Sequence, residues 1–529
     1  MKTLKWMVPG LLAVSLPLQA QDIYKMEMFS GEDLNGTARF VGMGGAMSGL
    51  GADISTMGTN PAGMGLYRRS DVALTGSVGV QPNAREFFDI NKARASFDQL
   101  GFVYSAPMGG DGLKFVNFGF NYHKRRNMKN FIGADNVSTG GLSQSWQMMD
   151  LSYVNTGWLD LSKDDDREYT TPLTLLGYDT QMLEMQTDAD GKVTGYLPVD
   201  ADHYNYKRVQ WGGIQQYDFN LSMNWKDRIY AGLTFGVHNV NVHSYTDYSE
   251  MIINPADNSL HEYYTTNEEA LTGTGYDLKL GVIIRPVEES PLRLGFAVHT
   301  PTFYNLTSSQ YLYMKSPFSH VDNGGNDIPY TEAGLDPGEN EYNLRTPWRF
   351  NFSMATTVGK YLALNAEYEY SNYSSAQVRY PSYDSYYYYT GGEKDRALSD
   401  EAKRFMNGVS TVRLGAELRV AKGAYVRAGY NYVSAPFKKD AYLNLFTASP
   451  SYYYSNNTDY VNLGAINRAT LGFGLRGKHF YADMAYQYQI QKGDLYTFHL
   501  GDDADRNRLS AKTVDLNRHN VMLTLGYKF

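Results

Sequence analysis

Charged side chains that recur at every second residue of apolar segments are the first groups in this chain that could do chemistry. Glu367 and Glu369 alternate with apolar residues in one segment, and Arg413, Glu417 and Arg419 do so in a later one. Arginine binds carboxylates through a planar bidentate fork, so an acidic ligand is one partner that such a row would suit. For each residue, a network of ion pairs inside the fold is the favoured interpretation. The set is Asp277, Lys279, Arg293, Glu367, Glu369, Arg413, Glu417, Arg419, Arg427, Arg476 and Asp483.

Other reactive residue types are too scattered to form a recognisable site. The chain has no cysteine, which excludes disulfides and thiolate metal sites. None of the histidines forms a His-x-x-x-His pair; His123, His238 and His299 are expected to point inward, and haem ligation by one of them is an open alternative. The Gly-Met-Gly sequence at 42–44 lacks the strand and helix that a dinucleotide loop requires. Because no Ser, His and polar orienter share one depth, we expect no enzyme, no cofactor and no metal.

The bulk composition narrows the class of protein. The 529 residues carry a net charge of −8, which argues against a nucleic-acid partner. The 45 tyrosines are a surplus that aromatic girdles at a membrane would explain. Residues 1–20 are predicted to be a cleaved secretory signal, with Lys2 and Lys5 before an apolar stretch that ends near Ala20. Beyond it no apolar run is long enough for a membrane-spanning helix, so the exported protein is either soluble or a β-barrel.

Segments with period-two alternation predict fourteen strands. In 228–238, for example, Ile229, Leu233 and Phe235 share one face, and small or polar residues share the other. Strands of about ten residues with one apolar and one polar face suit a barrel with lipid outside and a polar interior. The predicted strands are Asp71–Val80, Gln99–Ala106, Leu113–His123, Ile214–Trp225, Arg228–His238, Gly275–Arg285, Pro291–Thr300, Trp348–Val358, Tyr361–Tyr370, Thr411–Val420, Ala424–Val433, Arg468–Arg476, His479–Ile490 and His519–Phe529.

Short and long connections alternate along the chain. Lys226-Asp227 and Gly359-Lys360 are tiny, whereas 124–213 and 239–274 are long. An up-and-down outer-membrane barrel has this pattern, with short turns at the periplasmic end and long loops outside. We therefore predict an all-β fold, a 14-stranded antiparallel transmembrane β-barrel plugged by a small N-terminal hatch. Terminal Phe529 is expected to address the chain to the barrel assembly machinery.

The long loops contain predicted structure of their own. Leu142, Trp146 and Met149 fall at helical spacing and predict a short amphipathic helix; an outer capture groove for ligand and simple packing between loops are equally favoured roles. Ser399–Asn407 predicts a second helix, and 187–191 predicts the tip of a hairpin. Tyrosines at 386–389 and 452–454 form aromatic clusters that could stack on hydrophobic ligands or pack between loops.

The glycine-rich segment Gly36–Leu66 precedes the first predicted strand. Glycine lets backbones approach closely, so such a segment suits a confined space. On Ala38–Ala46 and above all on Asn60-Pro61-Ala62-Gly63, the chain resembles the FadL/TodX family of outer-membrane transporters for long-chain fatty acids and other hydrophobic compounds. Further matches are Leu414–Glu417, Arg427–Tyr430 with Ala435-Pro436, and Ala469–Gly474.

The resemblance implies a hatch over residues 21–70 that plugs a barrel over 71–529. It also implies a passive route: outer loops capture the hydrophobic ligand, a pocket receives it, the hatch N-terminus rearranges, and the ligand leaves sideways beside a kinked third strand. The longer outer loops of this chain leave the ligand open. The implied residues are Gln21, Asp22, Ile23 and Tyr24 at the hatch N-terminus, Asn60, Pro61, Ala62 and Gly63 in the hatch motif, Phe115, Asn117 and Gly119 on the third strand, and Leu142, Trp146 and Met149 in the capture loop.

These expectations place the protein in the outer membrane of a Gram-negative cell, surrounded by its lipids, with hydrophobic small molecules such as fatty acids as ligands. For the motif at Asn60, a structural turn is favoured over ligand contact. For Asn117 and Gly119, a kink in the strand is expected. Two alternatives stay open: a cell-surface hemin or haem receptor, and a structural or adhesive barrel without transport.

Overall fold

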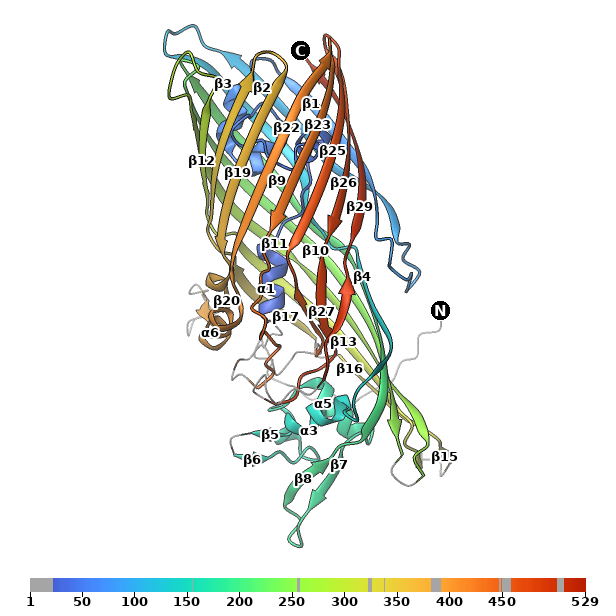
Figure 1. Cartoon of the computed structure of the whole chain (residues 1–529). Coiled ribbons are helices and arrows are strands. Elements are labelled where there is room, and N and C mark those ends of the chain that lie inside the picture. The colour runs from blue at the N-terminus through green and yellow to red at the C-terminus, as the bar shows by residue number, and fades with distance from the viewer. Residues whose placement is uncertain are drawn as a thin grey trace.

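One antiparallel sheet closes on itself to form the body of the molecule (Figure 1). The computed structural model describes residues 22–154, 156–254, 257–321, 326–336, 338–381, 392–446, 449, 458–501 and 509–529. β1 (Asp71–Val80) pairs with β29 (Arg518–Lys528) along its whole length, which closes the barrel. The strands between them are β2 (Ala93–Pro107), β3 (Leu113–Asn127), β9 (Asp200–Trp225), β10 (Ile229–Ile253), β11 (Leu260–Ile284), β12 (Arg293–His299), β18 (Arg349–Val358), β19 (Leu362–Asn372), β22 (Gly408–Ala421), β23 (Ala424–Val433), β25 (Ile466–Arg476) and β26 (Phe480–Ile490).

The fourteen predicted strands are confirmed, and β1 and β23 have the predicted bounds. The largest difference is in β9, β10 and β11, which are 26, 25 and 25 residues long. The β10–β11 ladder continues without a register shift from Ile229↔Ile284 to Ile253↔Leu260. In the outer halves the two faces change character: Asn239 and Asn241 face outward and are exposed, whereas Val240 and Val242 face inward and are buried. The outward apolar residues that reveal a strand in a membrane therefore stop before the strand does.

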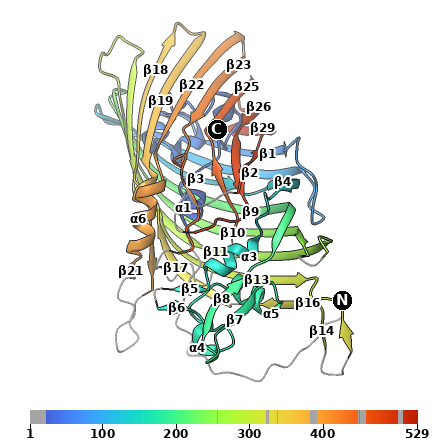
Figure 2. The ribbon, with the colours of Figure 1, turned by 60° about the horizontal axis from the view of Figure 1, so that its bottom comes forward.

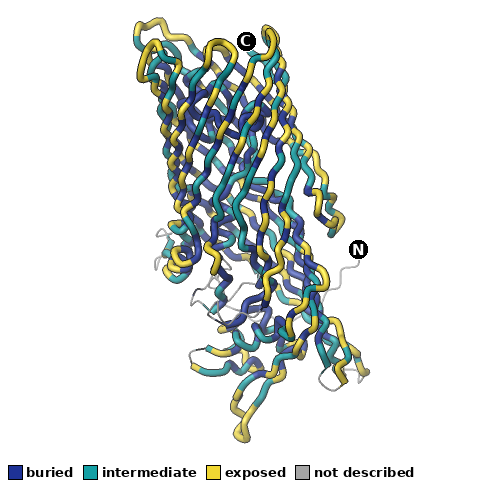
Figure 3. The backbone as a smooth tube through the Cα atoms, in the orientation of Figure 1, coloured by how far each residue is buried: buried dark blue, intermediate teal, exposed yellow. Residues whose placement is uncertain are grey.

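The outer surface of the barrel wall is apolar. Leu74, Phe102, Leu221 and Leu414 are exposed large hydrophobic side chains, whereas their sequence neighbours point into the barrel, and Figure 3 shows this alternation along the strands. A contiguous apolar surface of this kind indicates contact with lipid. Among the residues that the structure describes, no helix combines the length and apolar character needed to cross a membrane.

The two ends of the barrel differ as the connection lengths predicted (Figure 1). One end of the barrel carries tight turns between strands, and the C-terminal residue Phe529 lies at that end. The turn between β9 and β10 consists of Lys226 and Asp227, both with positive φ (52° and 56°), which is the two-residue hairpin turn whose twist matches the flanking strands. The Asn224 side chain accepts from the Asp227 main-chain N–H at 3.0 Å and stabilises the turn.

The loops at the other end build a cap (Figure 2). Additional strands continue the sheet beyond the barrel: β4 (Asn130–Ser138), β13 (Phe303–Ser316), β16 (Thr331–Leu335), β17 (Glu339–Arg345), β20 (Gln377–Tyr380) and β21 (Glu393–Lys394). Smaller pieces of the cap are α3 (Gln144–Asp150), β5 (Tyr153–Val154), β6 (Gly157–Trp158), α4 (Asp164–Arg167), α5 (Pro172–Asp179), β7 (Glu184–Thr187), β8 (Val193–Leu197), β14 (His320–Val321), β15 (Asp327–Ile328), η3 (Tyr373–Ser375), α6 (Arg396–Phe405), β24 (Tyr460–Leu463), β27 (Lys492–Tyr496) and β28 (Lys512–Asp515).

The predicted loop elements are present with shifted bounds. A helix does follow Leu142, but it begins at Gln144. The helix predicted from Ser399 begins at Arg396, because the Asp395 side chain caps it by accepting from Leu398 N at 2.9 Å. Strands β7 and β8 flank the predicted hairpin tip at 187–191. The tyrosine clusters at 386–389 and 452–454 lie outside the described residues.

Candidate functional site

The N-terminal segment lies inside the barrel as a plug. It consists of α1 (Ile23–Ser30), α2 (Ala38–Gly42), η1 (Ile54–Gly58) and η2 (Pro61–Leu66). Glycines of plug and wall meet where no side chain would fit: a Cβ on Gly429 of the wall would lie 2.1 Å from Gly44 N, and one on Gly42 would lie 3.1 Å from the Cα of Gly472. Close contact with the wall is therefore what the glycine-rich sequence provides.

The motif Asn60-Pro61-Ala62-Gly63 is buried against three strands of the wall. The Asn60 side chain accepts from Ala62 N at 3.1 Å and so starts η2. A Cβ on Gly281 would lie 2.1 Å from Asn60 Oδ1, and one on Gly232 would lie 2.4 Å from the carbonyl carbon of Pro61. None of the four motif residues lines the lumen cavity described below. These contacts support the structural role that the sequence favoured.

One group of ion pairs joins α2 to the wall near the short turns. Arg39 donates two hydrogen bonds of 2.9 Å to the Glu417 carboxylate. Glu417 also pairs with Arg427 at 2.6 Å, and Arg427 pairs with Asp483 at 2.7 Å. Asp483 in turn pairs with Arg476 at 3.2 Å. A chain of alternating charges such as this satisfies buried ions that would otherwise be costly.

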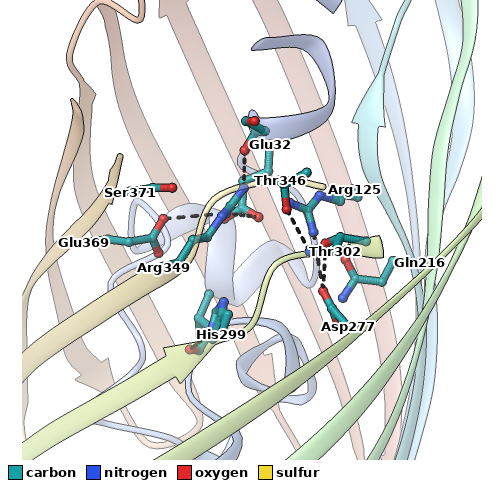
Figure 4. A network of polar contacts seen from close by, with 12 residues as sticks. Glu32, Arg125, Gln216, Asp277, His299, Thr302, Thr346, Arg349, Glu369 and Ser371 are labelled. Carbon is teal, nitrogen blue, oxygen red and sulfur yellow. Dashed lines mark hydrogen bonds and ion pairs between the residues drawn. The ribbon is translucent and has the colours of Figure 1, made fainter. Parts of the chain in front are cut away.

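A second group lies deeper in the lumen (Figure 4). Glu32 of the plug pairs with Arg349 at 2.7 Å and with Arg413 at 3.7 Å. Arg413 also pairs with Glu369 at 3.1 Å. Burial alone would raise the pKa of Glu32, but Arg349 and its cationic neighbours hold that pKa well below its usual range. At neutral pH the plug therefore carries a carboxylate at this point.

Asp277, Lys279 and two of the inward histidines are also engaged. Lys279 bridges Asp218 at 3.1 Å and Asp277 at 2.6 Å. His238 contacts the same Asp277 at 3.1 Å, and His299 contacts the plug carbonyl of Thr59 at 2.8 Å. The ion-pair network that the sequence favoured for these inward charges is thus observed, and the buried histidines have protein partners.

α1 lies in the lumen between this network and the outer cap (Figure 2). Its N-cap is Asp22, which accepts from Lys25 N at 2.8 Å, and Gln21 lies outside the described residues. The Ile23 side chain is buried. Tyr24 packs its ring 4.7 Å from that of Phe437 and donates to Asn462 at 2.9 Å. Farther along the helix Lys25 pairs with Glu269 of β11.

A cavity of about 200 Å³ follows one side of α1. Its lining combines apolar side chains with charged ones; the apolar part includes Met28, Met128, Leu271, Val433, Phe437 and Leu463. The charges are mostly paired, as in Arg126, which binds the Glu27 carboxylate of α1 at 3.0 Å. A lining of this composition can hold an elongated apolar molecule that carries one polar end. Of the predicted hatch residues, Asp22 and Tyr24 line it.

The barrel wall is incomplete between β2 and β3. Main-chain pairing of these strands ends at Gln99↔His123, so 93–98 and 124–127 face each other without a ladder. Beyond this window the side chain of Gln81, directly after β1, connects to β4. It donates to the Phe131 carbonyl at 2.8 Å and accepts from Phe131 N at 3.0 Å. The window is thus bounded on both sides by hydrogen bonds.

The plug closes this window from inside. Asn35 donates to the Lys124 carbonyl at 3.0 Å. Asp33 N donates to the Arg125 carbonyl at 2.9 Å, and the Asp33 carboxylate accepts from Asn127 N at 2.8 Å. In a complete wall, main-chain groups of β2 would form hydrogen bonds with these main-chain groups of β3. Residues 33–35 therefore replace the missing stretch of strand pairing.

The register shifts of β3 lie away from Asn117 and Gly119, where a kink was expected. Both neighbouring ladders run through Asn117 and Gly119 without a shift, and the shifts against β9 fall at 113/115 and 124/126. Asn117 instead donates to the plug carbonyl of Met64 at 2.7 Å. Gly119 leaves room for Met57, whose Cε would lie 2.2 Å from a Cβ there. These small residues receive the plug, which is why they interrupt the apolar pattern.

The predicted capture residues pack into the cap. Leu142, Trp146 and Met149 are partly buried against a hydrophobic cluster of the loops, and Trp146 donates to Asp200 at 3.0 Å. None of the three lines the lumen cavity. Phe115 lies at the other end of the barrel, beneath the guanidinium of Arg68 at 5.0 Å.

Sequence reasoning missed the residues that close the window. Asp33, Asn35 and Gln81 act on main-chain groups of a strand edge, and no spacing in a single sequence reports which edges lack a partner. The doublet Asp33 and Asn35 directly after α1 is the one visible signal, since both residue types bind main-chain groups locally.

Comparisons with known proteins identify the fold. No protein-family model and no curated protein sequence matches the chain. A FadL homologue from Pseudomonas aeruginosa is 14% identical with a TM-score of 0.50, over 94% of this chain and 99% of that one. The Ralstonia pickettii toluene transporter TbuX (14% identical, TM-score 0.46) and the P. putida toluene transporter TodX (12%, 0.46) cover the same 94% of this chain and 99% of theirs. The chain therefore has a FadL-type fold, a plugged fourteen-stranded barrel.

Proposed function

We propose that the protein is an outer-membrane transporter that passes hydrophobic molecules, fatty acids among them, by diffusion. The apolar outer wall of the barrel supports a location in the outer membrane. The solved FadL homologue from Pseudomonas aeruginosa has the same type of fold. The cavity beside α1 supports the ligand class, because burial of each methylene stabilises a bound chain by about 0.8 kcal/mol.

The single observation that carries the proposal is the closure of the window by plug residues. Asp33 and Asn35 hold the free edge of β3 with three hydrogen bonds. The same segment follows α1, which borders the lumen cavity. A shift of α1 on ligand binding would therefore withdraw the residues that close the wall. In this mechanism the ligand leaves sideways, between β2 and β3, and not through the periplasmic end.

The periplasmic end is a poor alternative exit. There the plug is held by the Arg39–Glu417 pair and by the glycine contacts of the Asn60 motif. Breaking these contacts would expose several buried charges together, which costs more than releasing the three hydrogen bonds of Asp33 and Asn35 while Glu32 keeps its pair with Arg349. Opening the window between β2 and β3 therefore costs less free energy than releasing the plug at the periplasmic end.

The test is to lock the window. The chain has no cysteine, so Asn35→Cys with Asp98→Cys, whose native side chains meet at 3.4 Å, gives a unique pair for a cleavable bifunctional thiol reagent. In proteoliposomes the crosslink should stop uptake of labelled oleate, and reductant should restore it. The matched control is Lys422→Cys with Lys478→Cys in two periplasmic turns. Uptake that continues unchanged through the locked window would refute the lateral route.

A further inference from the structure

The inner and outer rims of the window carry more cationic than anionic side chains. A cavity of about 90 Å³ lies at this position, between the β1–β2 hairpin, the start of β4 and the strands β26 and β29. Its cations are Lys92, Arg94, Lys129 and Arg518, with His519 beside them; its carboxylates are Asp33 and Asp98. This cavity shares Asp33, Asn127, Gln489 and Arg518 with the lumen cavity.

The carboxylates do not neutralise these cations. Among the described residues, none of the four cations has a carboxylate oxygen within 4 Å. Asp33 is bound to Asn127 N, and Asp98 accepts from Ser96 at 2.9 Å. Glu86, a further carboxylate of the hairpin, accepts from the Lys92 main-chain N–H at 3.0 Å. Every other group of inward charges described above is paired.

The strand register gathers these groups into one site. Arg94 lies opposite Gly79 on β1, and Gly79 lies opposite Asn520 on β29. Because Gly79 has no side chain, the space between the side chains of Arg94 and Asn520 stays open. One row further out, Arg518 lies opposite Gln489, and its Nε is buried without a hydrogen-bond partner. Cations and side-chain amides thus line an unfilled space.

The depth of the site in the membrane indicates what fills it. The rings of Tyr122 and Tyr217 pack at 5.3 Å in a tilted arrangement on the outer wall, and Tyr488 stacks on His519 at 4.6 Å. Such aromatic side chains mark the level where lipid head groups begin. The window opens at Lys124, two residues beyond Tyr122, and therefore at the level of lipid phosphates. Phosphate oxygens are strong acceptors for several cationic donors at once.

We propose that this cavity binds the phosphate head group of an anionic lipid of the outer leaflet, whose chains lie along the apolar wall beside β2. The assignment uses the outer-membrane location of the proposed function but does not require transport. The bound phosphate would lie beside the plug segment that closes the window, so lipid at this site would compete with an acidic ligand for passage.

The test measures lipid binding in place of uptake. The purified full chain, released from nanodiscs that contain equal amounts of dioleoyl phosphatidic acid and dioleoyl phosphatidylcholine, is analysed by native mass spectrometry for retained lipid. We expect at least tenfold enrichment of phosphatidic acid in the wild type. The triple variant Lys92→Gln, Arg94→Gln, Lys129→Gln should abolish that enrichment, since even one charge-assisted hydrogen bond of this kind contributes roughly tenfold in affinity. Arg518→Gln, which removes the partly buried cation of Arg518 alone, should reduce it by less.

The control removes the same charge at the opposite end, with Lys360→Gln, Lys422→Gln and Lys478→Gln in the periplasmic turns, and should leave enrichment unchanged. Equal retention of the two lipids, or an equal loss in the control, would overturn the proposal. Displacement of phosphatidic acid by inorganic phosphate at equal concentration would assign the site to free phosphate and overturn the lipid assignment. If the protein still transports oleate with the window crosslinked, the proposed lateral route is wrong, but the lipid-binding result is unaffected. Failure of the transport proposal and failure of the lipid proposal can therefore be distinguished.

Discussion

The two ends of the plug are attached to the wall in different ways. Near the short turns, Arg39, Glu417, Arg427, Asp483 and Arg476 form one continuous chain of ion pairs, and glycines of plug and wall are in contact. Near the outer cap, the segment after α1 holds a strand edge by a few separate hydrogen bonds beside two cavities. Breaking the first attachment separates a continuous chain of buried ion pairs, whereas releasing Asp33 and Asn35 from β3 breaks only hydrogen bonds as long as Glu32 keeps its pair with Arg349. One end of the plug is therefore an anchor and the other is a closure that can be released.

The largest effect should come from breaking the anchor. Glu417→Ala leaves Arg39 without its carboxylate partner and Arg427 with one fewer, so we expect a loss of about 3–5 kcal/mol in the free energy of unfolding. Urea unfolding followed by the gel mobility of the folded barrel measures it. The matched control is Glu288→Ala, which removes an exposed carboxylate 3.9 Å from Arg228 and should change stability by less than about 1 kcal/mol. Equal effects of the two variants would remove the distinction between anchor and closure.

The stability of the cap should depend on pH through one buried carboxyl group, unlike the stability of the ion-paired carboxylates near the short turns. Glu250, beyond the membrane-spanning part of β10, is buried; burial raises its pKa to about 7, although Tyr248, Ser143 and Gln144 N donate to it. The folded state thus holds the proton between about pH 4.5 and 7 while the unfolded state releases it, so the cap loses stability as pH rises through this window. The total is about 3 kcal/mol for a shift of this size.

Hydrogen exchange of α3 tests this pH dependence, because the Glu250 carboxylate binds the start of that helix. Protection of 144–150 should fall between pH 5 and pH 8 in the wild type. Glu250→Gln cannot titrate and should keep the same protection at both pH values. A pH response that survives in Glu250→Gln would assign the effect to another group.

A methyl group at the Asn60 motif should loosen the anchor by steric conflict alone. The new Cβ of Gly281→Ala would lie 2.1 Å from Asn60 Oδ1, and overpacking of this kind costs about 1–3 kcal/mol. Limited proteolysis and hydrogen exchange over 54–66 should show increased opening. Gly109→Ala, in a turn with nothing within 4 Å of the new Cβ, is the control and should show no change.

The smallest effect should come from the closure. Asn35→Ala removes one hydrogen bond to β3, worth about 1 kcal/mol. We expect faster hydrogen exchange in 124–127 and faster oleate uptake, with an unchanged midpoint of global unfolding. Asn407→Ala removes a comparable 2.8 Å bond to Phe437 O in the cap and should leave uptake unchanged. A global loss of stability in Asn35→Ala would mean that the closure is also part of the anchor.

The barrel could be predicted from the sequence because each strand faces two different media. Alternation between lipid and lumen leaves a period-two record in β1 and β23 that gives their ends correctly. That record is absent where β9–β11 leave the membrane, so their outer halves were not predicted. The inward charges were recognised by the same alternation, but their partners were not, since partners such as Glu32 and Arg349 are hundreds of residues apart.

Within the plug, the sequence determined that a glycine-rich segment must fit a confined space and that Asn60 begins a turn. Local chemistry decides both, because they depend on missing side chains and on a side chain bonding two residues ahead. Only the tertiary structure decided that the irregular part of β3 lies at 124–127 and that Asp33 and Asn35 complete it. A strand edge lacks partners because of how neighbouring strands diverge in space, and that divergence is a property of the closed barrel, not of any one segment.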